Sequence, residues 1–370
     1  MENENISIEI DGEEVDDIFY QDLISAEVEL DDELAGLFRI QLAIRQQSDG
    51  VWTYVDDERL SVWKQVTITA GLESDMEELI AGYITHINLE FDPDPSQCIL
   101  EISGMDGSIL MDREEKLKDW PNKKDSDIAS EIFGFHGFKP EVEDTEVIHD
   151  ETVSTIIQRE TDMQFLMRLA LRNGFDCYVQ GTDGYFGPSQ LDESPQPLLA
   201  VHFGEESNLN SFSIEVNSIT PVNVSMSQID RMNKEVLDVS VESAQQTSLG
   251  DTGPTDILAS GMEPGKVYMG MNTATGIPEM EALAQGLYHK AEWFVTGTGE
   301  ISGNMYGHVL KPRKTVTIKG INERHSGVYY VSRVTHFFSS NGYIQTFSVK
   351  RNAIMVVGDE DFASSGGGLF

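Results

Sequence analysis

Apolar and polar residues alternate along residues 1–100, and this period of two constrains the fold more than any other feature of the sequence. A period of two places successive side chains on opposite faces of a strand. Short alternating runs separated by turn residues are typical of an antiparallel sandwich or barrel. We therefore predict a first β unit over residues 1–104. The runs are Ile6/Ile8/Ile10, Ala26/Val28/Leu30, Phe38/Ile40/Leu42/Ile44, Val66/Ile68/Ala70, the less regular Tyr83/Ile84/Ile87/Leu89, and Ile99–Ile102.

The pattern changes after Gly104, where helical spacing of apolar residues alternates with short strand patterns. Two helices are predicted, each with a polar cap before its apolar stripe and a glycine after it. Strands are predicted at 175–180 and 185–186, on either side of a Gly-Thr-Asp-Gly turn. This gives a mixed α/β unit over 105–197. The caps and stops are Ser126-Asp127 and Gly134 for the first helix, and Thr161, Gln164 and Gly174 for the second.

Strand patterns return over 198–243 and again over 309–349, so a second β unit is predicted at 198–352. Within it, residues 244–279 are rich in Gly, Ser, Thr and Pro and are predicted to form a long loop. A helix is predicted over 278–295, because Pro278 suits a first helical turn and one apolar stripe follows. The remaining residues, 353–370, are predicted to be a flexible end that closes with an apolar pair.

Charge excludes several classes of partner. The 370 residues hold 25 Lys+Arg and 64 Asp+Glu, a formal net charge of −39. Stable binding to nucleic-acid phosphates or to an anionic membrane needs basic residues, so neither is predicted. The charge is uneven, since 1–100 carry 25 acids and 4 bases, whereas 301–352 carry one acid and eight bases. Either the acids form a solubilising face, or acidic and basic surfaces meet between copies or line a channel.

Other signals of location and redox chemistry are weak. Cys98 and Cys177 are too few for a disulfide scaffold, and no cluster of zinc ligands is visible. The first residues lack a signal-peptide pattern, and no apolar run reaches about 18 residues, the length of a membrane-spanning helix. We therefore expect the chain to fold in the cytoplasm without inserting into a membrane.

The usual catalytic motifs are absent from the sequence. Gly297, Gly299 and Gly303 have the wrong spacing for a dinucleotide site, and His325 and His336 are predicted as polar strand or loop residues. Paired carboxylates occur by chance among so many acids. We predict no catalytic residue, no cofactor and no metal site, and we interpret the acidic runs as solvated loop charge. These runs are Glu13-Glu14 with Asp16-Asp17, Asp31-Asp32-Glu33 and Asp56-Asp57-Glu58.

One stretch carries a family resemblance. Residues 158–179 read QRETDMQFLMRLALRNGFDCYV, which resembles the motif Q-x-x-E-T-D-x-x-F-L-x-R-L-A-x-x-x-G of the phage late-control D family. That family includes the baseplate hub proteins of contractile tails and the hub part of VgrG proteins in type VI secretion. The matching residues are Gln158, Glu160, Thr161, Asp162, Phe165, Leu166, Arg168, Leu169, Ala170 and Gly174.

Two further stretches agree with this resemblance. Residues 102–116 with 122–138 resemble the family's segment before the motif helix, and 325–352 resemble its closing hairpin. The hairpin residues at the expected places are Gly327, Tyr329, Val331, Val334, His336, Phe347 and Arg351.

The resemblance implies a structural protein and not an enzyme. It implies an α+β, mainly β fold with two tail-tube-like β-barrel domains and an α/β insertion between them. It also implies a homotrimer whose pseudo-sixfold ring joins a sixfold tail tube to a threefold spike. The implied partners are a spike protein, a tail-tube protein and other baseplate proteins, with DNA or an effector protein as passing cargo. After folding, the chain would become part of a phage tail or injection particle.

The family's VgrG members continue into an oligonucleotide-binding-like domain and a needle, and nothing like either is visible here. We therefore expect the spike to be a separate polypeptide, with 353–370 as a contact to it. Two alternatives stay open: a tail-tip glycan hydrolase, and a receptor-binding module of a non-contractile tail.

The motif residues are expected to have structural roles. Glu160, Thr161 and Asp162 are predicted as cap and helix-dipole residues. Arg168 either pairs with Glu160 or Asp162 or is an exposed helix charge. In a trimer, some of Lys311, Arg313 and Lys314 are predicted to face acids of a neighbouring subunit; if all three lie in solvent, the uneven charge serves solubility alone.

Overall fold

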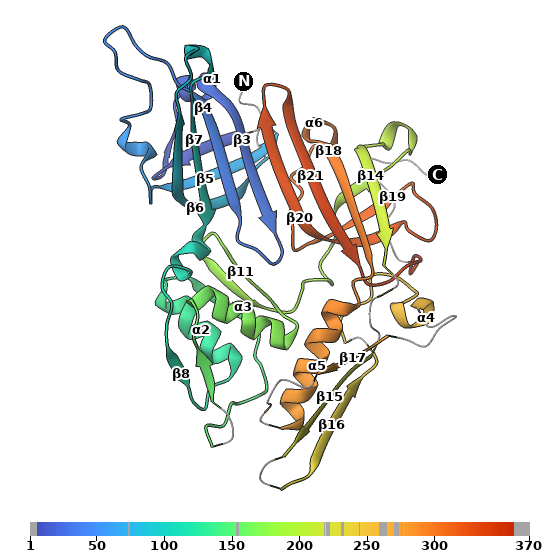
Figure 1. Cartoon of the computed structure of the whole chain (residues 1–370). Helices are drawn as coiled ribbons and strands as arrows, with labels where there is room; N and C mark the ends of the chain where they lie inside the picture. The colour runs from blue at the N-terminus through green and yellow to red at the C-terminus, as the bar shows by residue number, and fades with distance from the viewer. Residues whose placement is uncertain are drawn as a thin grey trace.

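The computed structural model describes residues 6–72, 75–152, 155–217, 219, 223–230, 233–243, 245–258, 265–269, 274 and 276–358. The fold is mainly β with a few helices, as the alternation predicted. Within the described residues, thirteen strands form one sheet that extends across both β units (Figure 1). None of the described helices is long and apolar enough to cross a membrane.

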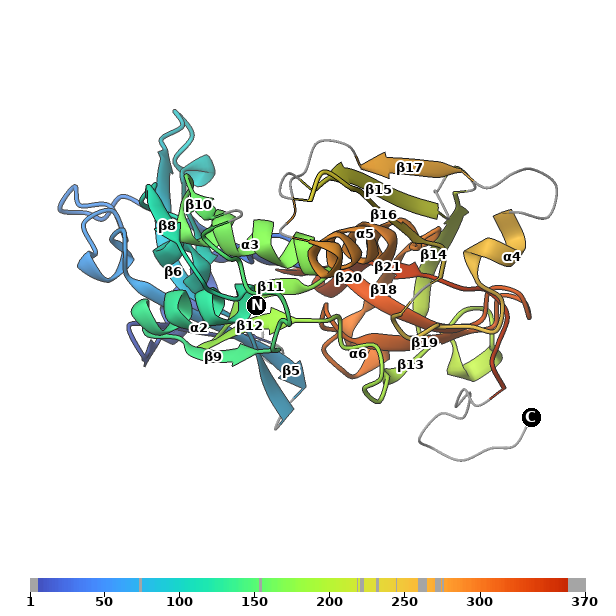
Figure 2. The ribbon, with the colours of Figure 1, turned by 90° about the horizontal axis from the view of Figure 1, so that it is seen from below.

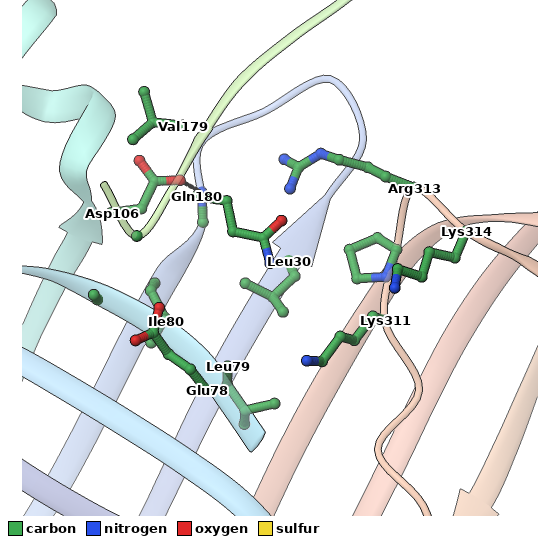
Figure 3. A pocket seen from close by; sticks show the side chains of 14 residues that line it. Leu30, Glu78, Leu79, Ile80, Asp106, Val179, Gln180, Lys311, Arg313 and Lys314 are labelled. Atoms are coloured by element: carbon green, nitrogen blue, oxygen red, sulfur yellow. Dashed lines mark hydrogen bonds between the residues drawn. The ribbon is translucent and has the colours of Figure 1, made fainter. Parts of the chain in front are cut away.

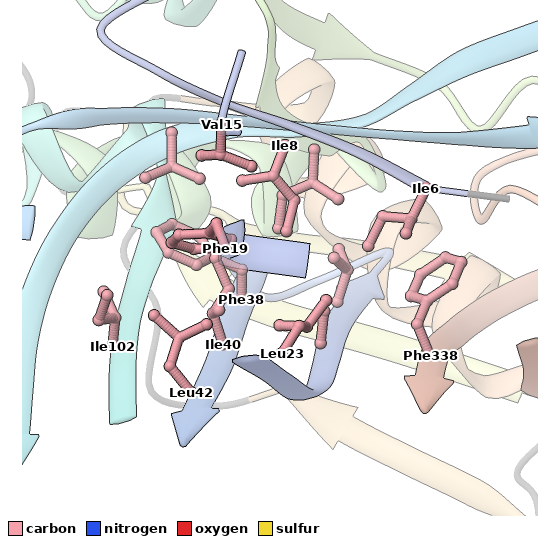
Figure 4. Close-up of a cluster of buried hydrophobic side chains, with 14 of the residues drawn as sticks. Ile6, Ile8, Val15, Phe19, Leu23, Phe38, Ile40, Leu42, Ile102 and Phe338 are labelled. Carbon is pink, nitrogen blue, oxygen red and sulfur yellow. The ribbon is translucent and has the colours of Figure 1, made fainter. Parts of the chain in front are cut away.

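The first β unit buries the alternating residues that the sequence marked. Ile8, Ile40 and Ile68 are fully or almost fully buried and meet in one cluster. Figure 4 shows this cluster, with Phe338 from the far end of the chain at its edge. Its elements are β1 (Ile6–Ile10), β2 (Glu13–Glu14), α1 (Asp17–Asp22), β3 (Leu23–Asp31), β4 (Leu37–Ala43), η1 (Glu58–Leu60), β5 (Gln65–Leu72), β6 (Asp75–Glu90), η2 (Pro95–Gln97) and β7 (Ile99–Asp106).

The middle unit packs two helices on small sheets. The longer helix begins after Thr161, whose hydroxyl accepts a hydrogen bond from the Gln164 amide, and ends at Gly174 in the left-handed conformation. Both ends confirm the sequence prediction. The elements are η3 (Gly107–Met111), β8 (Lys118–Trp120), α2 (Asp125–Phe135), β9 (Lys139–Val142), β10 (Ile156–Gln158), α3 (Asp162–Asn173), β11 (Asp176–Gln180) and β12 (Asp183–Gly187).

The second β unit contains an excursion between two of its strands. Its own elements are β13 (Gln196–Ala200), η4 (Gly204–Glu206), β14 (Leu209–Val216), β18 (Val295–Ser302), α6 (Gly303–Tyr306), β19 (Thr315–Lys319), β20 (Gly327–Ser339) and β21 (Gly342–Arg351). The excursion comprises β15 (Asn223–Ile229), β16 (Val236–Val241), α4 (Pro254–Leu258), β17 (Lys266–Met269) and α5 (Ile277–Ala291). β16, β15 and β17 form a separate sheet against which α5 lies (Figure 2).

The structure corrects three sequence predictions here. The described part of 244–279 is not all loop, because it contains α4 and β17. The helix predicted over 278–295 ends at Ala291, and Phe294 packs in the core of the second β unit. An apolar residue at the next helical position does not reveal whether the helix has already ended. The predicted flexible end begins too early, since Ala353 and Ile354 are buried; residues 359–370 lie outside the described residues.

Two strands join the β units. β3 pairs antiparallel with β20, from Ser25 opposite Ser339 to Asp31 opposite Arg333. The two units therefore share a continuous sheet, in the order β14-β18-β21-β20-β3-β4-β7-β6. The sequence did not predict this joint.

His336 lies fully buried beside this joint. Its Nδ1 is 2.8 Å from the Tyr343 hydroxyl, and its Nε2 has no hydrogen-bond partner among the described residues. Burial lowers the pKa of His336 to about 3, and the charge of Lys311 adds to this effect. The folded protein therefore holds a neutral imidazole at neutral pH.

Because the His336 imidazole is buried in its neutral form, we expect the protein to lose stability in acid. An unfolded histidine titrates near its ordinary pKa, so stability is full above that value and is lost as the pH falls toward about 3. At pH 5 the loss from this residue is ~2 kcal/mol of unfolding free energy relative to pH 7. Urea denaturation at both pH values should show a smaller difference for His336→Gln than for the wild type. Exposed His202→Gln is the control, and an unchanged difference in His336→Gln would contradict this assignment.

Candidate functional site: the joint between the two β units

The loop after β3 meets the second β unit through paired charges. Arg333 Nε lies 2.7 Å from Asp31 Oδ2, and Lys350 Nζ lies 2.6 Å from Asp32 Oδ2. Asp31 Oδ1 also accepts hydrogen bonds from two backbone amides of its own loop, at 2.9 and 3.0 Å. Both carboxylates are buried. The interpretation of this acidic run as solvated charge was therefore wrong for these two residues.

The middle unit also contacts the joint, through Asp176. The Tyr330 hydroxyl donates to Asp176 Oδ2 at 3.0 Å, and Lys350 Nζ lies 4.9 Å from the Trp293 ring centre. Burial raises the pKa of both Asp32 and Asp176, and the positive charge of Lys350 opposes this rise. Lys350 therefore pairs with the buried Asp32 of the first β unit, and its charge also acts on the half-buried Asp176 of the middle unit.

Lys311, Arg313 and Lys314 lie on one loop at the edge of the joint, facing Asp106, Glu78 and Gln180 across a small pocket (Figure 3). Lys311 Nζ is 2.5 Å from Glu77 Oε2 of the same chain. Arg313 donates to the Asp31 carbonyl and lies 4.0 Å over the Tyr178 ring. Lys314 is exposed. Two of the three thus have partners within the chain, while their contact with a neighbouring subunit stays a prediction.

The family motif forms a hydrogen-bonded network at the start of α3. Asp162 is almost fully buried and accepts bonds from Gln158 Nε2 at 2.8 Å, His136 Nε2 at 2.7 Å and Lys116 Nζ. Burial opposes its charge, but these bonds outweigh burial and lower the pKa of Asp162. Thr161 also donates to Asp112. The motif therefore ties α3 to the segments before and after α2.

Arg168 pairs with Glu160, at 2.7 Å between Nε and Oε1, which is the first of its two predicted acids. It also donates to the Ile157 carbonyl at 2.9 Å. Phe165, Leu166 and Leu169 are fully buried in the core of the middle unit. These residues hold the middle unit together.

The closing hairpin is held by a fully buried arginine whose role the sequence did not reveal. Arg351 donates to the carbonyls of Leu249 at 2.9 Å, Ser326 at 3.1 Å and Met355 at 2.7 Å. A Cβ at Gly327, where φ is +137°, would lie 2.6 Å from this guanidinium. Tyr329 lies beneath it, with the ring centre 5.3 Å away, and its hydroxyl donates to the His325 carbonyl at 2.6 Å. Gly327 thus leaves space for the guanidinium of Arg351, and the ring of Tyr329 packs against it.

The joint leaves one face of the continuous sheet uncovered. Except at Asp31, the residues of this face are exposed or half-buried, and they alternate with buried core residues along each strand. Arg39 lies between Glu27 at 3.9 Å and Glu101 at 3.7 Å, and Arg333 lies between Asp31 and Glu29. In these two groups acids outnumber bases by two to one, so this face keeps the acidic excess of the chain. Its hydroxyl residues include Ser213, Thr296, Thr298, Thr335, Thr346 and Ser348.

Comparison with known proteins now places the chain. A family model described as the Alg8 N-terminal domain matches residues 2–340. The chain belongs to this family. The matching model is not that of the late-control D family, so membership of that family is not shown. The comparison with curated proteins found no match.

Solved structures show which fold this member of the Alg8 N-terminal domain family has. The 43 kDa tail protein of prophage MuSo2 from Shewanella oneidensis is 13% identical, with a TM-score of 0.66, covering 95% of this chain and 99% of that one. A tail protein from Neisseria meningitidis is 14% identical, with a TM-score of 0.64, covering 95% and 97%. An Escherichia coli component of the type VI secretion system is 11% identical, with a TM-score of 0.56, covering 93% and 76%. The chain therefore has a phage tail-protein fold.

The joint makes a prediction about stability. Lys350→Met leaves Asp32 buried without its cation, which costs about 3–5 kcal/mol of unfolding free energy. Adding Asp32→Asn removes the unpaired charge and should recover most of that loss. Lys139→Met, at a largely exposed pair, should cost under about 1 kcal/mol. Urea denaturation of the three variants and the wild type measures this, and equal losses for Lys350→Met and Lys139→Met would show that the joint does not depend on this pair.

Proposed function

We propose that the chain is the structural central hub of a contractile tail or injection-system baseplate. In this role three copies form a ring of pseudo-sixfold symmetry between a sixfold tail tube and a threefold spike. The observation that carries the proposal is the β3–β20 joint, because it places two β units side by side in one continuous sheet. Three such pairs supply six similar units around one axis.

The similar structures support this role. Two are tail proteins covered almost end to end, and the E. coli protein is described as structurally similar to the T4 tail proteins gp27 and gp5. A chain of the Francisella PdpA–VgrG complex, with a TM-score of 0.56, is covered to 60%. The late-control D resemblance suggests the same hub role.

The uncovered face of the sheet, with its acidic excess, is proposed to line the ring. The acids of this face repel the phosphates of passing DNA, and its arginines are already paired with acids. DNA or an effector protein is the proposed cargo. The role is structural and not enzymatic, with a separate spike, the tail tube and other baseplate proteins as partners. The assembled location is a phage tail or injection particle.

The test is the mass of the full chain by native mass spectrometry and sedimentation, alone and with its tail-tube and spike proteins. A trimer that binds a tube hexamer on one face and a spike trimer on the other is expected. A chain that stays monomeric with both partners present would overturn the proposal. Turnover of a cell-wall glycan by the purified chain would favour the hydrolase alternative instead.

A further inference from the structure

The two β units are copies of one five-strand arrangement, in the same chain order. β3, β4, β5, β6 and β7 of the first unit correspond to β14, β18, β19, β20 and β21 of the second. The correspondence includes the irregularities. β6 and β20 have a bulge at the same place, Thr85 against β7 and Ser332 against β21. β3 and β14 also share one, at Ile24 and Asn210. Matching bulges fix the alignment of the copies to the residue.

Local structure repeats as well. Residues 64–68 read KQVTI and residues 314–318 read KTVTI. Just before them, Trp63 and Arg313 both have positive φ, at 69° and 65°. Trp63 donates its amide to the Ile84 carbonyl at 2.7 Å, and Arg313 donates to the Val331 carbonyl at 2.9 Å. The repeat does not extend to the first strands, because β1 pairs antiparallel with β5 whereas β13 pairs parallel with β19.

The copies also differ in which strand edges are paired. One edge of β20 has two partners. Its first half pairs with β19, and its second half pairs with β3. The equivalent half of β6, Ile84–Glu90, has no strand on that edge in the described part of the chain. β14, the counterpart of β3, pairs with β18 alone among the described strands. This half of β6 and the outer edge of β14 therefore have no partner strand among the described residues. They correspond to the edges of β20 and β3 that pair in the internal joint, and they lie on opposite flanks of the molecule (Figure 1).

Side chains on these two edges are apolar where the internal joint is apolar. Phe338 of β20 is 2% exposed, and its counterpart Phe91, just after β6, is 54% exposed. Leu30 of β3 is 9% exposed, and its counterpart Val216 of β14 is 42% exposed. Positions that are buried at the internal joint are therefore open to solvent at the free edges.

We propose that β6 of one copy pairs antiparallel with β14 of a second copy, in the register that β20 and β3 use within the chain. This rests on the proposed ring and specifies how its copies join. Transferring the internal register gives the pairs His86–Asn217, Ile87–Val216, Asn88–Glu215, Leu89–Ile214 and Glu90–Ser213, with Phe91 opposite Phe212.

This register is chemically consistent. Ile87, Leu89 and Phe91 meet three apolar residues of β14 on the core side, and the polar pairs fall on the uncovered face. The contact joins different surfaces of the two copies, which closes a ring when the rotation between them allows it. His86 stands where Arg333 stands in the internal joint, opposite Asn217 and not an aspartate. The joint between copies therefore depends mainly on apolar contacts and should be less sensitive to salt than a charge-paired one.

Cysteine pairs test the register directly. In Asn88→Cys/Glu215→Cys the two thiols lie opposite each other between copies, so mild oxidation should link one chain to the next. Thr335→Cys/Glu29→Cys is the equivalent internal pair, and should form a link within the chain. Asn88→Cys/Ser211→Cys is four residues out of register and should give no link. The native Cys98 and Cys177 are buried, and the single-cysteine variants measure their background.

A second measurement avoids cysteine chemistry. Phe91→Ser removes a half-exposed side chain whose ring lies 5.0 Å from that of Trp52, so the melting temperature of the single chain should fall only slightly while its self-association weakens about tenfold or more. Phe135→Ser, at a side chain 76% exposed in the middle unit, is the matched control and should leave association unchanged.

The outcomes separate this inference from the proposed function. If the chain trimerises with its tail partners but only the internal pair cross-links, the strand pairing is wrong and the hub proposal stands. Cross-linking of the out-of-register pair instead would also overturn the register. If the chain stays monomeric with both partners present, the hub proposal fails and this inference fails with it.

Discussion

The antiparallel pairing of β3 with β20 is the contact on which the rest of the molecule depends. It joins strands about three hundred residues apart in sequence, and it places Phe338 in the core of the first β unit. It also brings the acidic loop after β3 against Arg333 and Lys350. Without this pairing, each β unit would expose a strand edge and a strip of apolar side chains. Unpaired edges of that kind promote aggregation.

The charged pairs at the joint are needed because its acids are shielded from water. Burial of Asp32 and partial burial of Asp176 raise the pKa of each, and a nearby cation stabilises their charged forms. Lys350 supplies that cation from β21, so the basic end of the chain compensates for acids of the other units. The uneven charge of the sequence thus serves contacts within one chain. The uncovered face of the sheet keeps its arginines between pairs of acids, which leaves an acidic excess there.

The middle unit braces this arrangement from one side. The end of its helix α3 contacts α5 at two glycines. A Cβ at Gly286 of α5 would lie 2.8 Å from the amide nitrogen of Gly174, which ends α3. Close backbone approach of this kind leaves no space for a side chain. Arg172 of α3 also pairs with Glu279 at the start of α5. The excursion of the second β unit is therefore fixed to the middle unit, and both lie below the continuous sheet, at the same end of its strands (Figure 1).

The sequence by itself determined most of the strands and helices and the faces they bury, but not α4, β17 or the ends of α2, which includes the predicted cap Ser126-Asp127 and the predicted stop Gly134. Alternation marked the strands of both β units, and Thr161 and Gly174 marked the ends of α3, because capping and periodicity are local properties. The motif around Asp162 could be recognised as structural, although its partners Lys116 and His136 could not be named.

Only the tertiary structure decided which strands pair, that the β units are copies with matching bulges, and that Asp31 and Asp32 are buried. Alternation tells which face of a strand is buried and not which strand lies beside it. That choice is made by packing between residues hundreds of positions apart, which no local pattern records.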